Sequence, residues 1–114
     1  ERMAPATKAL KKGLNDLQAA TMWLMQNGMT NPDNAGAAST DYLHLFGLVA
    51  LGYMWAEMTK SAHEGLANGP DAFLDAKLAT VRFYFERILP ETALHLARIQ
   101  TGADNLMAMP AEAF

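Results

Sequence analysis

The chain has 114 residues and a formal net charge of −3, with 51% hydrophobic and 18% charged residues. This composition excludes a disordered chain, and the acidic balance gives no basic footprint for a nucleic acid. The sequence contains no cysteine, which excludes disulfides, thiol nucleophiles and cysteine-based metal sites and fits a cytoplasmic location.

Residue usage favours an all-α fold. The chain has 21 Ala and 15 Leu but only two Val and two Ile, and β-branched residues are the ones that strands prefer. At this length we expect a single helical domain over residues 1–114, built as a bundle of three to four helices. Because the sequence begins at Glu1 and not at methionine, we expect it to be a piece of a longer chain.

The first predicted helix runs from about Pro5 to Asn27, and Gly28 is expected to end it in the left-handed conformation. Apolar residues at four-three spacing predict one buried face, made of Leu10, Leu14, Leu17, Thr21 and Leu24. Charged residues lie on another face that we expect to be solvated: Lys8, Lys12 and Asp16. The three lysines at 8, 11 and 12 could instead contact phosphate or anionic lipid, but they are few in an acidic chain.

Residues 29–38 have turn chemistry and no periodicity, which predicts a loop. The second helix is expected to begin at Ser39, Thr40 or Asp41, since each of these side chains can cap a helix. Its body is apolar almost all round from Tyr42 to Ala56, and a run of 15 residues is shorter than the roughly 20 that span a bilayer. We therefore expect protein to bury this helix on several sides.

The third predicted helix begins after the turn at residues 68–70, with Asp71 placed well for the helix dipole. Its apolar stripe consists of Leu74, Leu78, Val81, Phe85, Ile88, Thr92, Leu96, Ile99 and Ala103. We expect a kink or break at Pro90, with both halves facing the same core, and an end near Thr101 and Gly102. The apolar tail should dock on the bundle or on a missing neighbour.

Few residues offer chemistry. The three histidines, His44, His63 and His95, have no metal-pair spacing, and we interpret His44 as a core residue. Gly47 and Gly52 have the spacing of phosphate-loop glycines, but the required Lys and Ser/Thr are missing, so we expect them to allow close helix packing instead. One face of the third helix carries Asp75, Arg82 and Glu86, which we interpret as solvated charges in preference to acid–base catalysts. No catalytic, cofactor-binding or metal-ligating residue is assigned.

Three segments carry a family resemblance: FGLVALGYMWAEM (46–58), DAKLATVRFYFERILPET (75–92) and ARIQTGADNLMAMPAEAF (97–114). Together they resemble the C-terminal extension of a subgroup of acyl-CoA dehydrogenases that includes the bacterial 3-methylmercaptopropionyl-CoA dehydrogenase-like enzymes. The resemblance covers nearly the whole chain and is weakest in residues 29–38.

The resemblance implies a parent flavoenzyme of fatty acid metabolism, an oxidoreductase that oxidises an acyl-CoA thioester between its α and β carbons with FAD. It also implies that FAD and the catalytic glutamate belong to the upstream dehydrogenase domains. Because no position here matches the catalytic-base motif, Glu57, Glu86 and Glu91 do not inherit that role. The segment is then a non-catalytic accessory domain, which packs on its own chain and takes part in a homo-oligomer.

The alternative is a self-contained helical dimerisation or interaction module without enzyme activity, favoured by the apolar second helix and the apolar tail. A third reading, binding to a membrane surface through Lys8, Lys11 and Lys12, is weaker because the basic cluster is thin.

Overall fold

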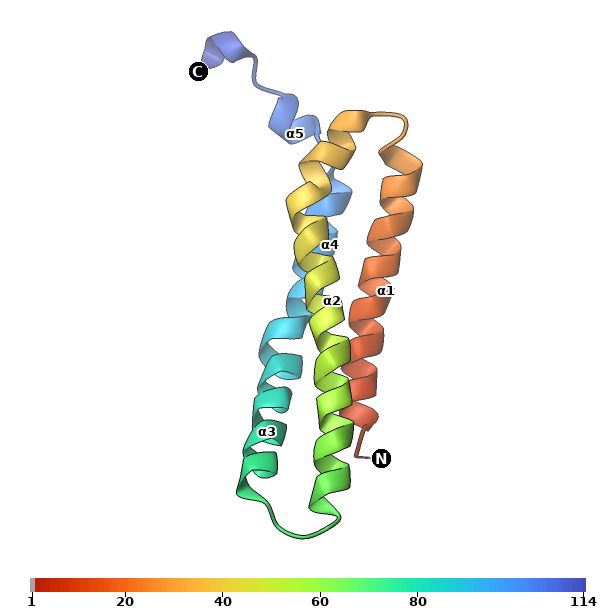
Figure 1. Cartoon of the computed structure of the whole chain (residues 1–114). Helices are drawn as coiled ribbons and strands as arrows, with labels where there is room; N and C mark the ends of the chain where they lie inside the picture. Colours follow the sequence, from red (N-terminus) through yellow and green to blue (C-terminus); the bar gives the residue numbers. More distant parts are fainter. Residues whose placement is uncertain (1) are drawn as a thin grey trace.

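The computed structural model describes residues 2–114, and these form helices with no strand (Figure 1). Two long helices, α1 (Ala4–Asn27) and α2 (Pro32–Leu66), lie antiparallel. The chain returns along α2 through α3 (Ala72–Phe83) and α4 (Thr92–Thr101), and α5 (Asp104–Met107) leads into the C-terminal segment. The predicted all-α bundle is confirmed. Its extents of 67 × 29 × 14 Å make it a thin, elongated bundle, so each helix has a broad face away from the core.

Helix α1 agrees with the predicted bounds, but its buried face is rotated relative to the prediction. Small residues make its closest contacts, because Ala6, Gly13 and Ala20 are buried whereas Leu14 is 42% exposed. Asp16, predicted to face solvent, is only 6% exposed and was therefore placed wrongly. Gly28 keeps a right-handed φ of −76°, so the predicted left-handed end of this helix is also wrong.

Helix α2 begins at Pro32, about seven residues before the predicted start, and most of the predicted loop at 29–38 is helical. The side chain of Asn31 accepts a hydrogen bond from the backbone N–H of Asp33 at 3.1 Å, and Pro32 occupies the first turn. An N-cap Asn followed by Pro is a sequence signal for a helix start, because proline lacks the donor that the first turn leaves unpaired. The proposed caps Ser39, Thr40 and Asp41 lie inside the helix.

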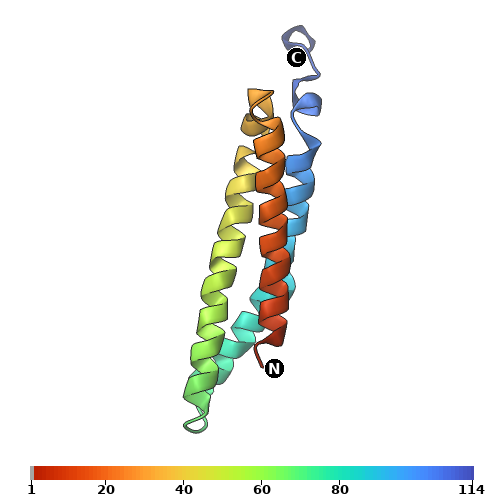
Figure 2. The ribbon, with the colours of Figure 1, turned by 90° about the vertical axis from the view of Figure 1, so that its right-hand side faces the viewer.

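The third predicted helix is divided into α3 and α4. Asp71 caps α3 by accepting hydrogen bonds from the N–H groups of Phe73 and Leu74 at 2.9 and 3.2 Å. Between the two helices the backbone forms a π-helical turn (Tyr84–Ile88) and a 3-10 turn (Leu89–Glu91), and Figure 2 shows α3 inclined to α4. Gly102 ends α4 with a φ of +76°, which a residue with a side chain rarely adopts.

The predicted stripe of α3 and α4 does face the core throughout. Five of its positions are buried, namely Val81, Phe85, Thr92, Ile99 and Ala103, and the other four are half-buried. One hydrophobic cluster lies around the π-helical turn and contains Ala6, Val81, Tyr84, Phe85 and Leu89. A second lies between α1, α2 and α4 and contains Ala20, Ala38, Leu45, Val49 and Ile99.

The two glycines of the second helix behave differently. A Cβ atom at Gly52 would lie 3.2 Å from Leu10 Cδ1 and 3.5 Å from Leu89 Cδ1, so this glycine allows α1 and the 3-10 turn to approach α2. A Cβ atom at Gly47 would meet nothing within 4 Å. The prediction of close packing is thus confirmed for Gly52 and wrong for Gly47.

Candidate functional site

The outer face of α2 is the most unusual surface of the described chain. It consists of Leu43, Phe46, Gly47, Ala50, Leu51 and Met54, which share the side of the helix opposite the buried Leu45, Val49 and Gly52. Leu43 is 71% exposed, and Phe46, Leu51 and Met54 are each more than half exposed. The expected burial of α2 on several sides is therefore wrong, since one side packs and the other does not.

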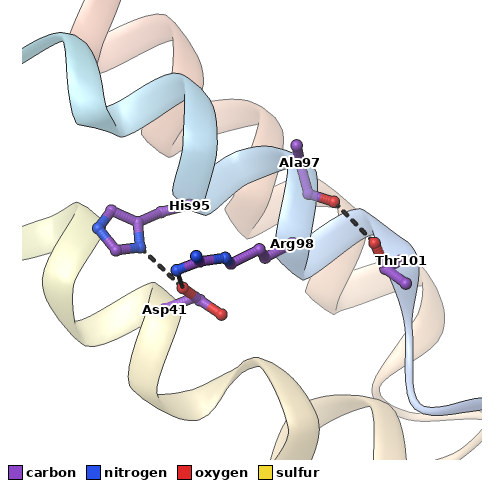
Figure 3. Close-up of polar contacts among 5 residues, drawn as sticks. All are labelled: Asp41, His95, Ala97, Arg98 and Thr101. Atoms are coloured by element: carbon purple, nitrogen blue, oxygen red, sulfur yellow. Dashed lines mark hydrogen bonds and ion pairs between the residues drawn. The ribbon is translucent and has the colours of Figure 1, made fainter. Parts of the chain in front are cut away.

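A polar cluster joins α2 to α4 (Figure 3). His95 Nδ1 lies 2.7 Å from Asp41 Oδ1, and Arg98 reaches the same oxygen at 3.6 Å. Because an ionised carboxylate can only accept, the proton is on Nδ1 of His95. The ring of His44 stacks on that of His95 with centroids 5.5 Å apart. His44 is itself exposed, so its assignment to the core is wrong.

This Asp–His pair resembles two members of a catalytic triad, but the third member is not in place. A nucleophilic triad needs a hydroxyl or thiol within hydrogen-bond reach of the second imidazole nitrogen. The Thr101 hydroxyl in Figure 3 lies away from the His95 ring and donates to the carbonyl of Ala97 at 3.0 Å. The geometry fits a link between two helices, with Asp41 accepting from His95 and paired with Arg98.

A second polar cluster lies in the interior and was missed by sequence reasoning. Asp16 Oδ2 accepts hydrogen bonds from Lys12 Nζ at 2.6 Å and from the buried hydroxyl of Thr92 at 2.8 Å. The contact with Thr92 ties α1 to the start of α4 across 76 residues of sequence. Because Lys12 is engaged in this way, the basic cluster proposed for a membrane surface is reduced to Lys8 and Lys11, which are exposed.

The charged residues predicted on α3 are solvated, as expected. Arg82 and Glu86 form an exposed ion pair at 2.8 Å, which raises the pKa of Arg82 through the hydrogen bond and charge of Glu86. Asp75 is exposed on the same helix. Nothing in this arrangement buries a carboxylate in the way that acid–base catalysis needs.

Tyr84 is the other residue with a shifted pKa. Its hydroxyl donates to the backbone carbonyl of Leu48 in α2 at 2.5 Å, at the start of the π-helical turn. Burial, with a smaller contribution from the negative charge of Glu91, raises the pKa of Tyr84 above its usual value. This hydrogen bond stabilises the contact between α2 and the irregular segment.

An open groove of about 520 Å³ lies where α1 begins, between α1, α2 and α3. Its floor is apolar and includes Ala6, Val81 and Phe85, whereas its rim carries charges of both signs, with Arg2 and Glu86 among them. No group of three or more His, Cys, Asp or Glu residues in the part from 2 to 114 could hold a metal ion. No helix in that part is long and apolar enough to cross a membrane.

The C-terminal segment leaves the bundle after Ala103, which is buried (Figure 1). Beyond it the apolar side chains of Leu106, Met107 and Met109 are exposed, and Phe114 is 93% exposed. The expectation that this tail docks on the bundle is therefore wrong. Docking on a neighbour stays a prediction.

The fold and its surfaces define a helical domain with internal polar links and a large unpaired apolar face. The chain matches the family described as "Acetyl-CoA dehydrogenase C-terminal like" over residues 1–110, and it belongs to that family. It is 32% identical over 108 residues to the 3-methylmercaptopropionyl-CoA dehydrogenase of Ruegeria pomeroyi, a match that covers 94% of this chain. The same match covers 17% of that enzyme, so the chain spans about one sixth of the length of the relative.

Proposed function

We propose that this chain is the accessory C-terminal domain of a FAD-dependent acyl-CoA dehydrogenase and is not catalytic by itself. The observation that carries the proposal is the match to the C-terminal family over residues 1–110, together with a dehydrogenase relative of which this segment is a small part. In this proposal the upstream dehydrogenase domains of the same chain bind FAD and the acyl-CoA and supply the catalytic base, in the cytoplasm of a bacterium.

The N-termini of α2 and α3 do not favour the pyrophosphate of the flavin cofactor. The pyrophosphate of a dinucleotide is held where a helix N-terminus offers free N–H groups and no competing negative charge. Helix α2 has its first N–H groups capped by Asn31, with Asp33 beside it, and α3 is capped by the carboxylate of Asp71. Both observations support the proposal that the FAD site belongs to the rest of the chain.

The domain offers the rest of the enzyme surfaces for docking. Its apolar tail and the groove beside the start of α1 both expose nonpolar atoms that a neighbouring domain could cover. Its buried polar side chains, in contrast, are hydrogen-bonded within the domain, as in the Asp16–Thr92 and Asp41–His95 contacts. This division favours a role in architecture over a role in chemistry.

The test is made on the full-length parent chain. Purified parent protein is expected to show the absorbance of bound flavin, which bleaches when an acyl-CoA substrate is added. The 114-residue segment alone is expected to bind no FAD, as measured by fluorescence titration with the free cofactor. A parent without flavin that is unchanged by a panel of acyl-CoAs would contradict the proposal.

The second candidate, a self-contained helical dimerisation module without enzyme activity, is favoured by the outer face of α2. An apolar face of this extent is unusual on a monomer and common on interaction modules. The same spectrum distinguishes the two candidates, because a module without an attached dehydrogenase would show no flavin in its full-length form.

A further inference from the structure

Two asparagines of this chain are followed directly by a glycine: Asn27 by Gly28 and Asn68 by Gly69. In such a pair the backbone nitrogen of the glycine can attack the side-chain carbonyl carbon of the asparagine, because glycine has no Cβ atom to shield its own nitrogen. The reacting groups are the same in both pairs. Any difference in their reactivity is therefore set by the structure around them.

The first pair lies at the end of α1 and is held in helical geometry. Gly28 has φ −76° and ψ −28°, and its N–H donates to the carbonyl of Leu24 at 2.7 Å. The side-chain amide of Asn27 donates to the carbonyl of Trp23 at 2.9 Å, and the carbonyl of Asn27 accepts from the side chain of Asn34 at 3.2 Å. Attack would require the main chain to turn and these hydrogen bonds to break, so the end of the helix protects Asn27.

The second pair lies in the turn between α2 and α3, outside both helices. Asn68 is exposed, and no hydrogen bond holds its side-chain amide within residues 2–114. Gly69 has φ +135°, and a Cβ atom built there would meet nothing within 4 Å. The N–H of Gly69 makes one turn hydrogen bond, to the carbonyl of Leu66 at 3.1 Å. The side chain under attack is therefore unrestrained, and a single turn hydrogen bond restrains the attacking nitrogen.

We propose that Asn68 is a site of spontaneous deamidation, which the structure of the α2–α3 turn selects over Asn27. The Gly69 nitrogen loses its proton to hydroxide and forms a bond to the side-chain carbonyl carbon of Asn68. The bond from that carbon to the side-chain nitrogen breaks, and the nitrogen takes a proton from water and leaves as ammonia. The product is a five-membered succinimide ring. Water then opens the ring at one carbonyl or the other, which gives aspartate or isoaspartate, and no step changes an oxidation state.

Both products place a new carboxylate in the α2–α3 turn of a chain whose net charge is already −3. An aspartate at position 68 precedes the start of α3, where the helix dipole favours negative charge and where Asp71 already accepts from the N–H of Phe73 at 2.9 Å. Isoaspartate instead lengthens the main chain between α2 and α3 by one carbon atom. The folded domain should therefore tolerate the aspartate, whereas the isoaspartate alters the connection between the two helices.

Peptide mapping of the full-length parent chain, after long incubation in neutral buffer at physiological temperature, tests the proposal. Trypsin releases Asn68 in the peptide Ser61–Lys77, which contains no other asparagine. This peptide should gain the mass of an amide-to-acid conversion at least about ten times faster than Asn27 does, because opening a helix end costs more free energy than opening a surface turn. An isoaspartyl methyltransferase should methylate the same peptide, because the ring route produces isoaspartate.

Two controls separate the effect of structure from that of sequence. In concentrated urea neither the helix nor the turn remains, so Asn27 and Asn68 should deamidate at similar rates, within roughly threefold. The variant Asn68→Gln keeps an exposed amide, but its longer side chain would have to close a six-membered ring. Its peptide 61–77 should show no mass gain over the same time, and its helical circular dichroism spectrum should be unchanged because position 68 is exposed.

If Asn68 kept its amide in the folded chain but lost it in urea, the turn would protect it and the proposal would be overturned. Equal rates at Asn27 and Asn68 in the folded chain would also overturn the proposal, and so would aspartate formed without isoaspartate. Each of these results is independent of the proposed enzyme function, which is read from flavin bleaching of the parent chain.

Discussion

The inner face of α2 packs Leu45, Val49 and Gly52 against α1, α4 and the 3-10 turn, whereas the outer face leaves Leu43 and Met54 exposed. The two faces are equally apolar in sequence. They differ in shape, since the inner face meets small residues of its neighbours, such as Ala20, at close range. Hydrophobicity therefore indicates that a face needs a partner, but the partner's surface decides whether it lies within the same chain.

The largest difference between the two faces is expected for leucine truncations. Leu45 is 0% exposed, and Leu45→Ala should lower the free energy of unfolding by about 2–5 kcal/mol through loss of contacts and a residual cavity. Leu43→Ala on the outer face should change it by less than about 0.5 kcal/mol. Urea unfolding of both variants measures this difference. Equal losses would mean that the outer face is packed within one chain.

The glycines sharpen the same comparison. Gly52→Leu would force a side chain against Leu10 and Leu89 and should cost about 1–3 kcal/mol of unfolding free energy through overpacking. Gly47→Leu meets open space and should stabilise the monomer by up to about 1 kcal/mol, because leucine is a better helix former. The thermal unfolding temperatures of the two variants should shift in opposite directions. A shift in the same direction would contradict the assignment of the faces.

The interior and surface ion pairs extend the comparison to polar contacts. Asp16→Ala removes the acceptor of the buried Thr92 hydroxyl and should cost about 1–3 kcal/mol of stability. Glu86→Ala breaks the exposed pair with Arg82 and should cost much less, because solvent screens both charges. Chemical denaturation curves of the two variants measure the difference. If Glu86→Ala lowered the free energy of unfolding as much as Asp16→Ala, the burial of a polar contact would not determine its contribution to stability.

The smallest of the four expected differences in stability concerns the hydrogen bond from Tyr84 to Leu48. Tyr84→Phe should lower stability near neutral pH by about 0.5–1.5 kcal/mol. Because the pKa of Tyr84 is raised in the folded state, its contribution is present below about pH 10, the usual pKa of tyrosine, and is lost as pH rises through the folded-state pKa. The difference in stability between the original chain and Tyr84→Phe should therefore narrow as the pH rises above about 10, as measured by thermal melting. If the difference in stability between the two chains did not change with pH, this role for the ionisation of Tyr84 would be contradicted.

Local patterns predicted those features that depend on neighbours along the chain. The four-three stripe from Leu74 to Ala103 faces the core, because one-sided periodicity leaves a helix only one way to bury its apolar residues. The Asp71 cap follows equally from local hydrogen bonding. The same capping rules could have predicted the start of α2 at Asn31 and Pro32. The turn-forming residues that follow led instead to the prediction of a loop.

The residues of the candidate site show the opposite case. Asp16 could not be recognised as buried, because its partner Thr92 lies 76 residues away, and His95 meets Asp41 only through the packing of α4 on α2. The exposure of the outer face of α2 could not be predicted, because a helix that is apolar all round has no polar side in its sequence to mark the solvent-facing surface.

The sequence by itself determined the helical class, the core stripe of α3 and α4, and membership in the C-terminal family of acyl-CoA dehydrogenases. These depend on composition, periodicity and similarity, which are all properties of the order of residues. Tertiary structure alone decided that Gly52 contacts its neighbours whereas Gly47 faces open space. It also decided that Asp16 is buried whereas the apolar side chains of the C-terminal segment are exposed. Each of these depends on which distant surface comes within a few ångströms, because burial and hydrogen bonding are properties of pairs of surfaces and not of single segments.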